Sequence, residues 1–333
     1  MSNIHSNISI FVPHIGCPNM CSFCNQRHIT GKHLAPTAED VDRAVNIAIS
    51  GKNYDPETTE IAFFGGSFTA INRNYMITLL NSAFKYVNKG LVYGIRISTR
   101  PDAIDIGILA LLKSYGVTSI ELGAQSMNDK VLKKNNRGHT SKDVITASKL
   151  IKSMGFSLGI QMMTGLLGDS DDMAIKTAKE IVKLSPDTVR IYPTIVLKDT
   201  DLAALYADGF YKPQTIDNAV NLASKLLLIF NEANIRVIRL GLHSIEPDSY
   251  IAGPWHPAFS ELCISNLYYE KAKSILNDKG SYTLKVNPSE LSKMIGQKRI
   301  NISKLHELGF DCTIKTDDTL NPYEIIVERN SEL

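Results

Sequence analysis

Short apolar runs alternate with longer amphipathic segments from the N-terminus to about residue 240. Six runs rich in β-branched and apolar residues have the length of buried strands, at 8–12, 60–64, 94–98, 119–122, 157–163 and 188–193. Six segments of helical period follow them in turn, at 38–50, 74–88, 104–115, 142–154, 171–184 and 216–231. This alternation predicts a parallel sheet with helices in the crossovers. A seventh strand is predicted at 236–240.

Loops that contain polar residues and glycines follow each predicted strand. In (β/α) barrels the functional loops lie at the carboxyl ends of the strands, which matches this distribution. We therefore predict an α/β fold whose main unit, residues 1–240, is a partial (β/α)6 barrel.

Past Pro254 the pattern changes. One long helix is predicted at 258–276, and a strand, two short helices and two strands follow at 282–286, 289–295, 300–308, 311–315 and 323–327. We predict a connecting helical segment over 241–280 and a small C-terminal α+β domain over 281–333.

The composition is that of an ordinary globular protein, with 44% hydrophobic and 21% charged residues. A formal net charge of +2 gives no global sign of nucleic-acid binding, so no DNA partner is expected and any basic surface must be local. No apolar run approaches membrane-spanning length, and the first ten residues lack the features of a secretory signal. The expectation is a cytoplasmic protein with no membrane partner.

Three of the five cysteines, Cys17, Cys21 and Cys24, lie within eight residues. Their Cys-x3-Cys-x2-Cys spacing lets one loop present three thiolates to one metal centre, with a coordination position left open. A [4Fe–4S] cluster with three protein ligands fits this pattern. Two alternatives remain, a zinc site completed by His14 or His28, and reduced thiols without a metal. The isolated Cys263 and Cys312 are expected to be small buried hydrophobic residues.

The cysteine segment, with Phe23 before its last cysteine, resembles the loop of the radical S-adenosylmethionine (SAM) superfamily. The resemblance implies an enzyme in which Cys17, Cys21 and Cys24 hold a [4Fe–4S] cluster. The open iron would chelate SAM, which an electron cleaves to a 5′-deoxyadenosyl radical. An electron donor such as flavodoxin or ferredoxin is expected as a partner.

Polar residues at successive strand ends are candidates for binding SAM. Gly65 and Gly66 follow the second strand, where this superfamily holds the methionyl ammonium. Arg100 could pair with the SAM carboxylate or with Asp102, and Gln125 could read the ribose or adenine or satisfy loop backbone. The full predicted set is Gly65, Gly66, Ser98, Arg100, Glu121, Gln125 and Lys198.

Longer segments resemble the radical SAM domain of the elongator complex catalytic subunit, namely residues 120–126, 136–140 and 190–198. This resemblance implies an enzyme that modifies the wobble uridine of tRNA. Two features differ. The first two cysteines are closer together here, and only about 90 residues follow the barrel, where that subunit carries an acetyltransferase domain. Acetyl-CoA chemistry is therefore not expected.

The tail resembles a KH RNA-binding core, whose Gly-x-x-Gly loop between two helices clamps the nucleic-acid backbone. In this chain the corresponding loop is Gly296-Gln297-Lys298-Arg299, in which an arginine replaces the second glycine. The predicted RNA-binding residues are Gly296, Lys298, Arg299 and Lys304. A small domain with a solvated basic face is the alternative.

Three hypotheses for function follow. The first is a radical SAM enzyme that modifies tRNA or another RNA. The second is a radical SAM enzyme that acts on a small anionic metabolite such as a tetrapyrrole. The third is a non-catalytic iron–sulfur protein that binds RNA.

Overall fold

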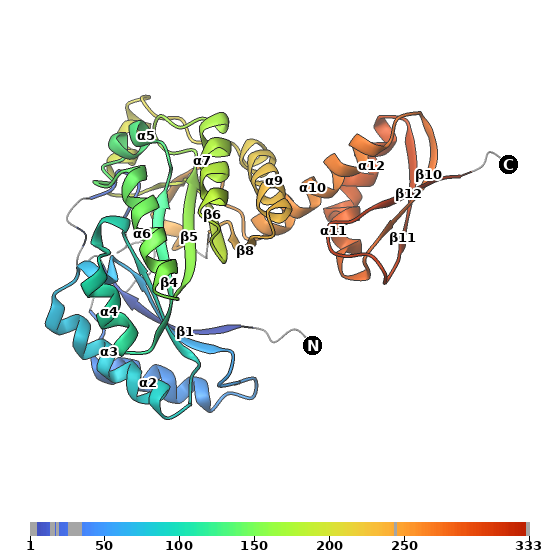
Figure 1. Cartoon of the computed structure of the whole chain (residues 1–333). Coiled ribbons are helices and arrows are strands. Elements are labelled where there is room, and N and C mark those ends of the chain that lie inside the picture. The colour runs from blue at the N-terminus through green and yellow to red at the C-terminus, as the bar shows by residue number, and fades with distance from the viewer. Residues whose placement is uncertain (1–4, 14–16, 18–19, 26–34, 243–244, 331–333) are drawn as a thin grey trace.

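A curved sheet of seven parallel strands forms the main unit of the computed structural model, which describes residues 5–13, 17, 20–25, 35–242 and 245–330 (Figure 1). The strands pair in the order β1-β2-β3-β4-β5-β6-β8. Their bounds are Ser6–Val12, Thr59–Gly65, Gly94–Thr99, Val117–Gln125, Ser157–Thr164, Thr188–Pro193 and Arg236–Leu240. The predicted partial barrel is confirmed, and so is its seventh strand.

Helices from the crossovers cover the outer face of this sheet (Figure 1). The six that follow strands are α2 (Ala38–Ile49), α3 (Arg73–Asn88), α4 (Ile106–Ser114), α6 (Ser141–Ser153), α7 (Asp171–Lys183) and α9 (Ile216–Glu232). Each begins at a capping side chain, and Thr37 and Thr140 form complete capping boxes. Gly116, with φ of +70°, comes directly after the C-cap of α4, where the left-handed conformation favours glycine.

Side chains alternate between the two faces along each barrel strand. The outward residues are apolar and fully buried against the helices, for example Ile61, Ile97 and Leu122. Burying each such side chain stabilises the fold by about 1.5–3 kcal/mol. The inward residues are mostly polar, such as Glu60 on β2 and Glu121 on β4. The core therefore lies between sheet and helices, while the inside of the barrel is charged.

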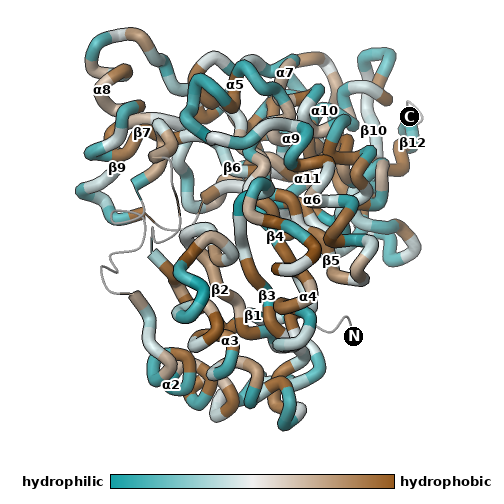
Figure 2. The backbone as a smooth tube through the Cα atoms, turned by 60° about the vertical axis from the view of Figure 1, so that its left-hand side comes forward, coloured by the Kyte–Doolittle hydropathy of each residue, from teal (hydrophilic) through white to brown (hydrophobic). Residues whose placement is uncertain are grey.

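A lobe beside the open side of the sheet was not predicted. It consists of α8 (Asp201–Ala207) and the antiparallel ribbon of β7 (Val196–Leu197) and β9 (Tyr250–Ala252), which Figure 2 shows next to one another. A separate small apolar cluster holds it together, formed by Val196, Leu202 and Tyr211. The short helix α5 (Asp129–Lys134) after β4 was also missed.

The C-terminal unit stands to one side of the barrel and is reached through α10 (Phe259–Ile275) (Figure 1). It contains β10 (Gly280–Val286), α11 (Leu291–Ile295), α12 (Ile300–Glu307), β11 (Phe310–Thr316) and β12 (Ile326–Arg329). β10 pairs parallel to β11 and antiparallel to β12. The predicted strand–helix–helix–strand order is confirmed.

Two further predictions concern the last strand and the two isolated cysteines. The last strand, predicted at 323–327, begins only at Ile326, because Asn321 and Glu324 close a turn through Asn321 N–H donating to Glu324 Oε2 at 2.8 Å. Cys263 on α10 is fully buried, as predicted, whereas Cys312 is only half-buried. Among the described residues, no helix has the length and hydropathy needed to span a bilayer.

Candidate functional site

The cysteine loop follows β1 and therefore lies at the edge where all the parallel barrel strands end. A turn joins Cys21 and Cys24, whose backbone N–H donates to the Cys21 carbonyl at 3.0 Å. Phe23 packs into the small apolar cluster of the lobe. The loop is thus anchored by an apolar side chain while its thiols stay partly exposed.

Asn135 connects the cysteine loop to the barrel. It is fully buried after α5, and its Oδ1 accepts from Ser22 Oγ at 2.9 Å and from Leu167 N–H at 3.3 Å. Its Nδ2 donates to the carbonyls of Val131 and Leu167, and its own carbonyl accepts from Ser22 N–H. One amide therefore fixes the position of three segments around the thiols.

The electrostatics of the thiols follow from their crowding. Burial, and then the charge of Cys21, raise the pKa of Cys24 to about 12, while Arg137 acts to lower it. Arg137 Nη1 also donates to Cys21 Sγ at 3.0 Å. Three sulfur donors that repel one another as thiolates, beside one cation, suit a cationic iron–sulfur cluster.

Zinc was one alternative to an iron–sulfur cluster at the cysteine loop. Among the residues that the structure describes, no three His, Cys, Asp or Glu side chains, the three cysteines included, are grouped to hold a single metal ion. His14 and His28, which were considered as completing ligands for zinc, lie outside the described residues. Cys17, Cys21 and Cys24 are free thiols, and their role as the ligand set stays a prediction.

Gly65 and Gly66 at the end of β2 lie against β1. Gly65 has φ of +111°, and a Cβ there would come within 2.5 Å of Val12 O and of the Phe11 ring. Gly66 N–H donates to Val12 O at 2.7 Å. The next residue, Ser67, contacts Thr99 at 2.9 Å. The glycines thus let β2 approach the strand that leads into the cysteine loop.

Arg100 at the end of β3 forms the ion pair that was the alternative to SAM binding. Its Nη2 donates to Asp102 Oδ2 at 2.8 Å and to the Arg137 carbonyl at 3.0 Å, and its Nε also donates to Asp102. Burial alone would lower its pKa, but hydrogen bonding to Asp102 and the nearby Cys17 and Cys21 raise it. Arg100 is therefore close to the thiols, with two of its nitrogens already bound.

Gln125 lies at the end of β4. Its Oε1 is a buried acceptor with no hydrogen-bond partner among the residues that the structure describes. The residue is only 9% exposed and adopts a left-handed backbone with φ of +66°, at a bulge in the pairing of β4 with β5. Buried acceptors are rarely left unpaired in proteins. A ligand that offers an N–H or O–H donor, as the adenine amine and ribose hydroxyls of SAM do, fits this position.

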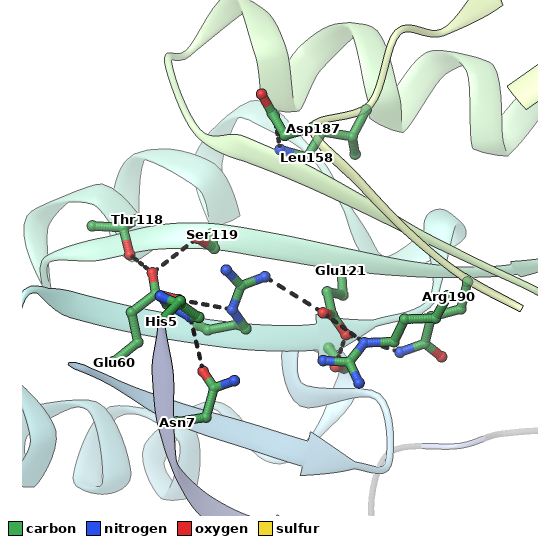
Figure 3. Close-up of polar contacts among 12 residues, drawn as sticks. His5, Asn7, Glu60, Thr118, Ser119, Glu121, Leu158, Asp187 and Arg190 are labelled. Carbon is green, nitrogen blue, oxygen red and sulfur yellow. Dashed lines mark hydrogen bonds and ion pairs between the residues drawn. The ribbon is translucent and has the colours of Figure 1, made fainter. Parts of the chain in front are cut away.

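Glu121 lies deeper inside the barrel, in a network of buried charges (Figure 3). Its Oε1 accepts from Arg190 Nε at 2.9 Å and lies 3.4 Å from Arg96 Nη1, and its Oε2 accepts from Gln161 at 3.0 Å. Ser98 contacts the same oxygen at 3.4 Å. The Glu121 carboxylate therefore already has protein partners on both oxygens.

Glu60 on β2 belongs to the same network, because Arg96 contacts both Glu60 and Glu121. It accepts from Arg96 Nε at 2.8 Å, from Thr118 at 2.6 Å and from Ser119 at 2.9 Å, and His5 Nε2 lies 3.1 Å away (Figure 3). Burial acts to raise its pKa, but the hydrogen bond with His5 and the charge of Arg96 outweigh burial and hold the pKa at about 2. The two carboxylates and Arg96 thus tie β2, β3 and β4 together.

The remaining predicted residues are Lys198, beside the cysteine loop, and those of the tail. Lys198 is exposed, and its carbonyl accepts from Asn25 of the cysteine loop at 3.3 Å. In the tail, Gly296 has φ of +76°, and Lys298 and Arg299 also adopt the left-handed region, at +51° and +61°. Lys304 lies over the ring of Tyr269, with Nζ 5.3 Å from the centroid.

Several residues of this centre were not assigned a role from sequence. Arg137 lies in the segment 136–140 that carries the family resemblance, so its importance was signalled but its contact with Cys21 was not. Asn135 directly precedes that segment. Arg190 likewise lies in the segment 190–198 that carries the resemblance. For Arg96 the only signal was an inward position on a strand, which requires the register of the sheet.

The family comparisons agree with this geometry. The model of the radical SAM superfamily matches residues 11–181, and the model of the radical SAM C-terminal domain matches residues 186–269. Members of the superfamily bind a [4Fe–4S] cluster and SAM. The thiol set and the open acceptor of Gln125 fit both groups.

Similar proteins are found among curated sequences and solved structures. The tRNA uridine(34) acetyltransferase of Methanocaldococcus infernus is 35% identical over 131 residues, which is 38% of this chain and 24% of that protein. Elongator complex protein 3 of Homo sapiens is 31% identical over 193 residues, 52% of this chain and 35% of that protein. This chain thus spans about a quarter to a third of the length of these relatives.

A structure of Methanocaldococcus infernus Elp3 with an N-terminal deletion superposes with a TM-score of 0.65 and 22% identity. The match covers 84% of this chain and 66% of that one. At this identity the likeness shows a shared fold.

Proposed function

We propose that this chain, which belongs to the radical SAM superfamily, is an enzyme that modifies tRNA. The observation that carries the proposal is where the elongator-like segments lie. Gln125, Arg137 and residues 193–198 come from three such segments and surround the cysteine loop at the carboxyl ends of the strands. The relatives that share sequence with this chain are named as tRNA uridine(34) acetyltransferase and Elongator complex protein 3.

In this proposal Cys17, Cys21 and Cys24 would hold the cluster through their thiolates. When bound and reduced by a donor such as flavodoxin or ferredoxin, the cluster would supply the electron for reductive cleavage of SAM. Gln125 accepts a hydrogen bond from the adenosyl part through its otherwise unpaired Oε1. Gly65 and Gly66, at the end of β2, lie at the strand edge where the methionyl ammonium is expected.

The inward charges have a supporting role. Since the Glu121 carboxylate already accepts from Arg190 and Gln161, we propose that it orients these side chains rather than binding SAM directly. Arg190 is fixed inside the barrel by two contacts. Its Nε donates to Glu121, and its guanidinium carbon lies 5.5 Å from the centroid of the Phe64 ring. The fixed side chains of Glu121 and Arg190 lie below the strand ends and limit how far a substrate can enter the barrel.

RNA is held by the tail in this proposal. Lys298 and Arg299 are exposed in the loop between α11 and α12, and Arg299 takes the left-handed conformation that glycine would adopt at the fourth position of a Gly-x-x-Gly loop. Arg299 thus adopts a backbone conformation that favours glycine, although its side chain differs. The two cations can meet phosphates of a bound strand.

The decisive experiment compares the modified nucleosides in tRNA from cells with and without this protein. One nucleoside should disappear, and its precursor should accumulate, in the strain without it. With the purified, reconstituted and reduced protein, tRNA from that strain should increase 5′-deoxyadenosine formation above the rate without RNA. An unchanged nucleoside profile together with no stimulation by tRNA would rule the substrate assignment out.

A further inference from the structure

Arg137 is the only cationic side chain for which the described part of the chain places a hydrogen-bond donor on a cysteine sulfur. Its Nη1 donates to Cys21 Sγ, with 3.0 Å between the two atoms. Neither the cysteine spacing nor the superfamily match assigns a role to this arginine. It lies 116 residues from Cys21 in the sequence.

The guanidinium is held at several points and cannot swing freely. Nη2 donates to the Gly123 carbonyl at 2.7 Å, and the Arg137 carbonyl accepts from Arg100 Nη2 at 3.0 Å. Nε is buried and has no hydrogen-bond partner among the described residues. The contact with Cys21 is therefore built into the fold of β4 and the segment after α5.

A donor in this position acts on the charge of a cluster sulfur. One-electron reduction adds a negative charge to the cluster, and no bond or proton at Arg137 changes in that step. A hydrogen bond and a positive charge at a ligating thiolate stabilise the reduced form more than the oxidised form. Removing both should make reduction harder. Outer partners of metal ligands commonly tune the metal in this way.

We propose that Arg137 sets the reduction potential of the cluster by donating a hydrogen bond to Cys21 Sγ, as a positioning residue that touches neither SAM nor substrate. The inference rests on the proposed ligand set of Cys17, Cys21 and Cys24. The planar fork of arginine is required, because it must reach Cys21 Sγ and Gly123 O at the same time. Lysine keeps the charge and loses one of the two contacts.

The test is a potentiometric titration of the reconstituted full-length protein, in which EPR follows the reduced cluster. In the Arg137→Gln variant the ratio of reduced to oxidised cluster at a fixed potential should fall about tenfold, which is about 59 mV lower for one electron. Arg137→Lys should lie between native and Gln. Lys133→Gln, an exposed change of the same charge in the same segment, should match the native protein. Equal potentials in all four proteins would overturn the inference.

A second measurement does not use Arg137→Gln and covers the case in which that variant fails to assemble a cluster. The native protein is labelled with ¹⁵N-arginine and reduced, and hyperfine spectroscopy is used to detect arginine nitrogen coupled to the cluster spin. A ¹⁵N coupling that is lost in Arg137→Lys is expected, while its absence from the native protein would refute the contact. If the native chain forms no EPR-active cluster at all, that result contradicts the proposed function, and the inference about Arg137 falls with it. A normal cluster without arginine coupling contradicts the inference alone.

Discussion

The Oε1 atom of Gln125 is a buried acceptor without a partner in the described ranges of the chain, and we expect a ligand to donate a hydrogen bond to it. Replacing Gln125 by Met keeps the length of the side chain and removes the acceptor. We expect SAM affinity to fall about tenfold, since one hydrogen bond contributes roughly 1–1.5 kcal/mol. Equilibrium dialysis with labelled SAM on the reconstituted protein measures this.

The matched control for Gln125→Met is Gln297→Met, the same change at an exposed glutamine in the tail. It should leave SAM affinity at the native value. Both proteins should retain the native cluster absorbance, because neither residue contacts a cysteine sulfur among the described residues. Native SAM affinity in the Gln125 variant would show that its amide does not contact SAM.

The cysteines separate into two groups by environment as well as by spacing. Cys24 lies in the loop with two other thiols, while Cys263 is sealed in the apolar core, where burial raises its pKa. Replacing Cys24 by Ala should therefore abolish the cluster, with no iron-dependent absorbance after anaerobic reconstitution. The native chain should bind close to four irons.

Cys263→Ala serves as the control for the cysteine experiment. It should keep the native iron content and lose only about 1 kcal/mol of unfolding free energy, through the small cavity left by the sulfur. Iron analysis and urea titration measure the two quantities. Full iron loading in Cys24→Ala, or zinc in place of iron in the native protein, would contradict the ligand assignment.

At the residue scale the sequence could identify which side chains lie at the carboxyl ends of the strands, but it could not identify the partners of those side chains. Arg100 was correctly expected at the end of β3, with SAM and Asp102 as competing partners, and its two contacts with Asp102 became visible only in the fold. Arg137 could not be connected to Cys21, because two loops far apart in sequence form that contact. Local pattern carries no information about such distances.

Among the elements, the barrel strands were predictable because their outward residues form regular apolar runs. The inner network was not predictable, since each member appears as a single polar residue within a strand. Arg96 meets Glu60 and Glu121 only because the register places Ala62 opposite Arg96 and Ser98 opposite Glu121. The lobe of α8, β7 and β9 was missed because its elements are two to seven residues long.

The network makes a prediction about acid stability. The Glu60 carboxyl has a folded pKa of about 2 against an ordinary value of 4.5, so the carboxylate stabilises the fold above pH 4.5. That stability is lost as the pH falls from about 4.5 to about 2. A lowering of this size corresponds to about 3 kcal/mol. The Glu60→Gln variant should be less stable at pH 7 by a similar amount, because Arg96 loses a partner.

Urea unfolding of the cluster-free protein at pH 7 and pH 3 tests this prediction. The native protein should lose more stability than Glu60→Gln between the two pH values, so that the two become more alike in acid. Glu57→Gln, an exposed carboxylate three residues earlier, should follow the native protein at both. If the native and Glu60→Gln proteins lose the same amount, the pKa of Glu60 is not lowered by folding.

On the scale of the whole molecule, α10 links two cores. Its first half contributes Phe259 and Cys263 to the barrel core, while Tyr268 and Ala272 in its second half belong to the core of the tail. A continuous helix shared by both units resists independent rotation at its midpoint. The loop 296–299 is therefore carried on a fixed arm rather than on a flexible linker. Such an arm suits a domain that delivers a large substrate to the barrel.

The last prediction concerns RNA binding by this arm. Changing both Lys298 and Arg299 to Glu should weaken tRNA binding at least tenfold, because contacts to phosphate are replaced by repulsion. The native affinity should fall as salt rises, and the double variant should show a shallower dependence, by about 0.7 in the logarithmic slope for each lost phosphate contact to a single strand. Filter binding across a salt series measures both.

The control is Lys176→Glu with Lys179→Glu, the same charge change at exposed positions on α7. Since net charge alone would weaken binding equally in both double variants, only a local contact predicts that the tail variant is affected more. Formation of 5′-deoxyadenosine without RNA should be native in both, because the cysteine loop and strand ends are unchanged. Equal losses in the two variants would mean that RNA meets the chain through its overall charge. No loss in either would place the RNA site away from the tail, leaving the barrel to bind its substrate alone.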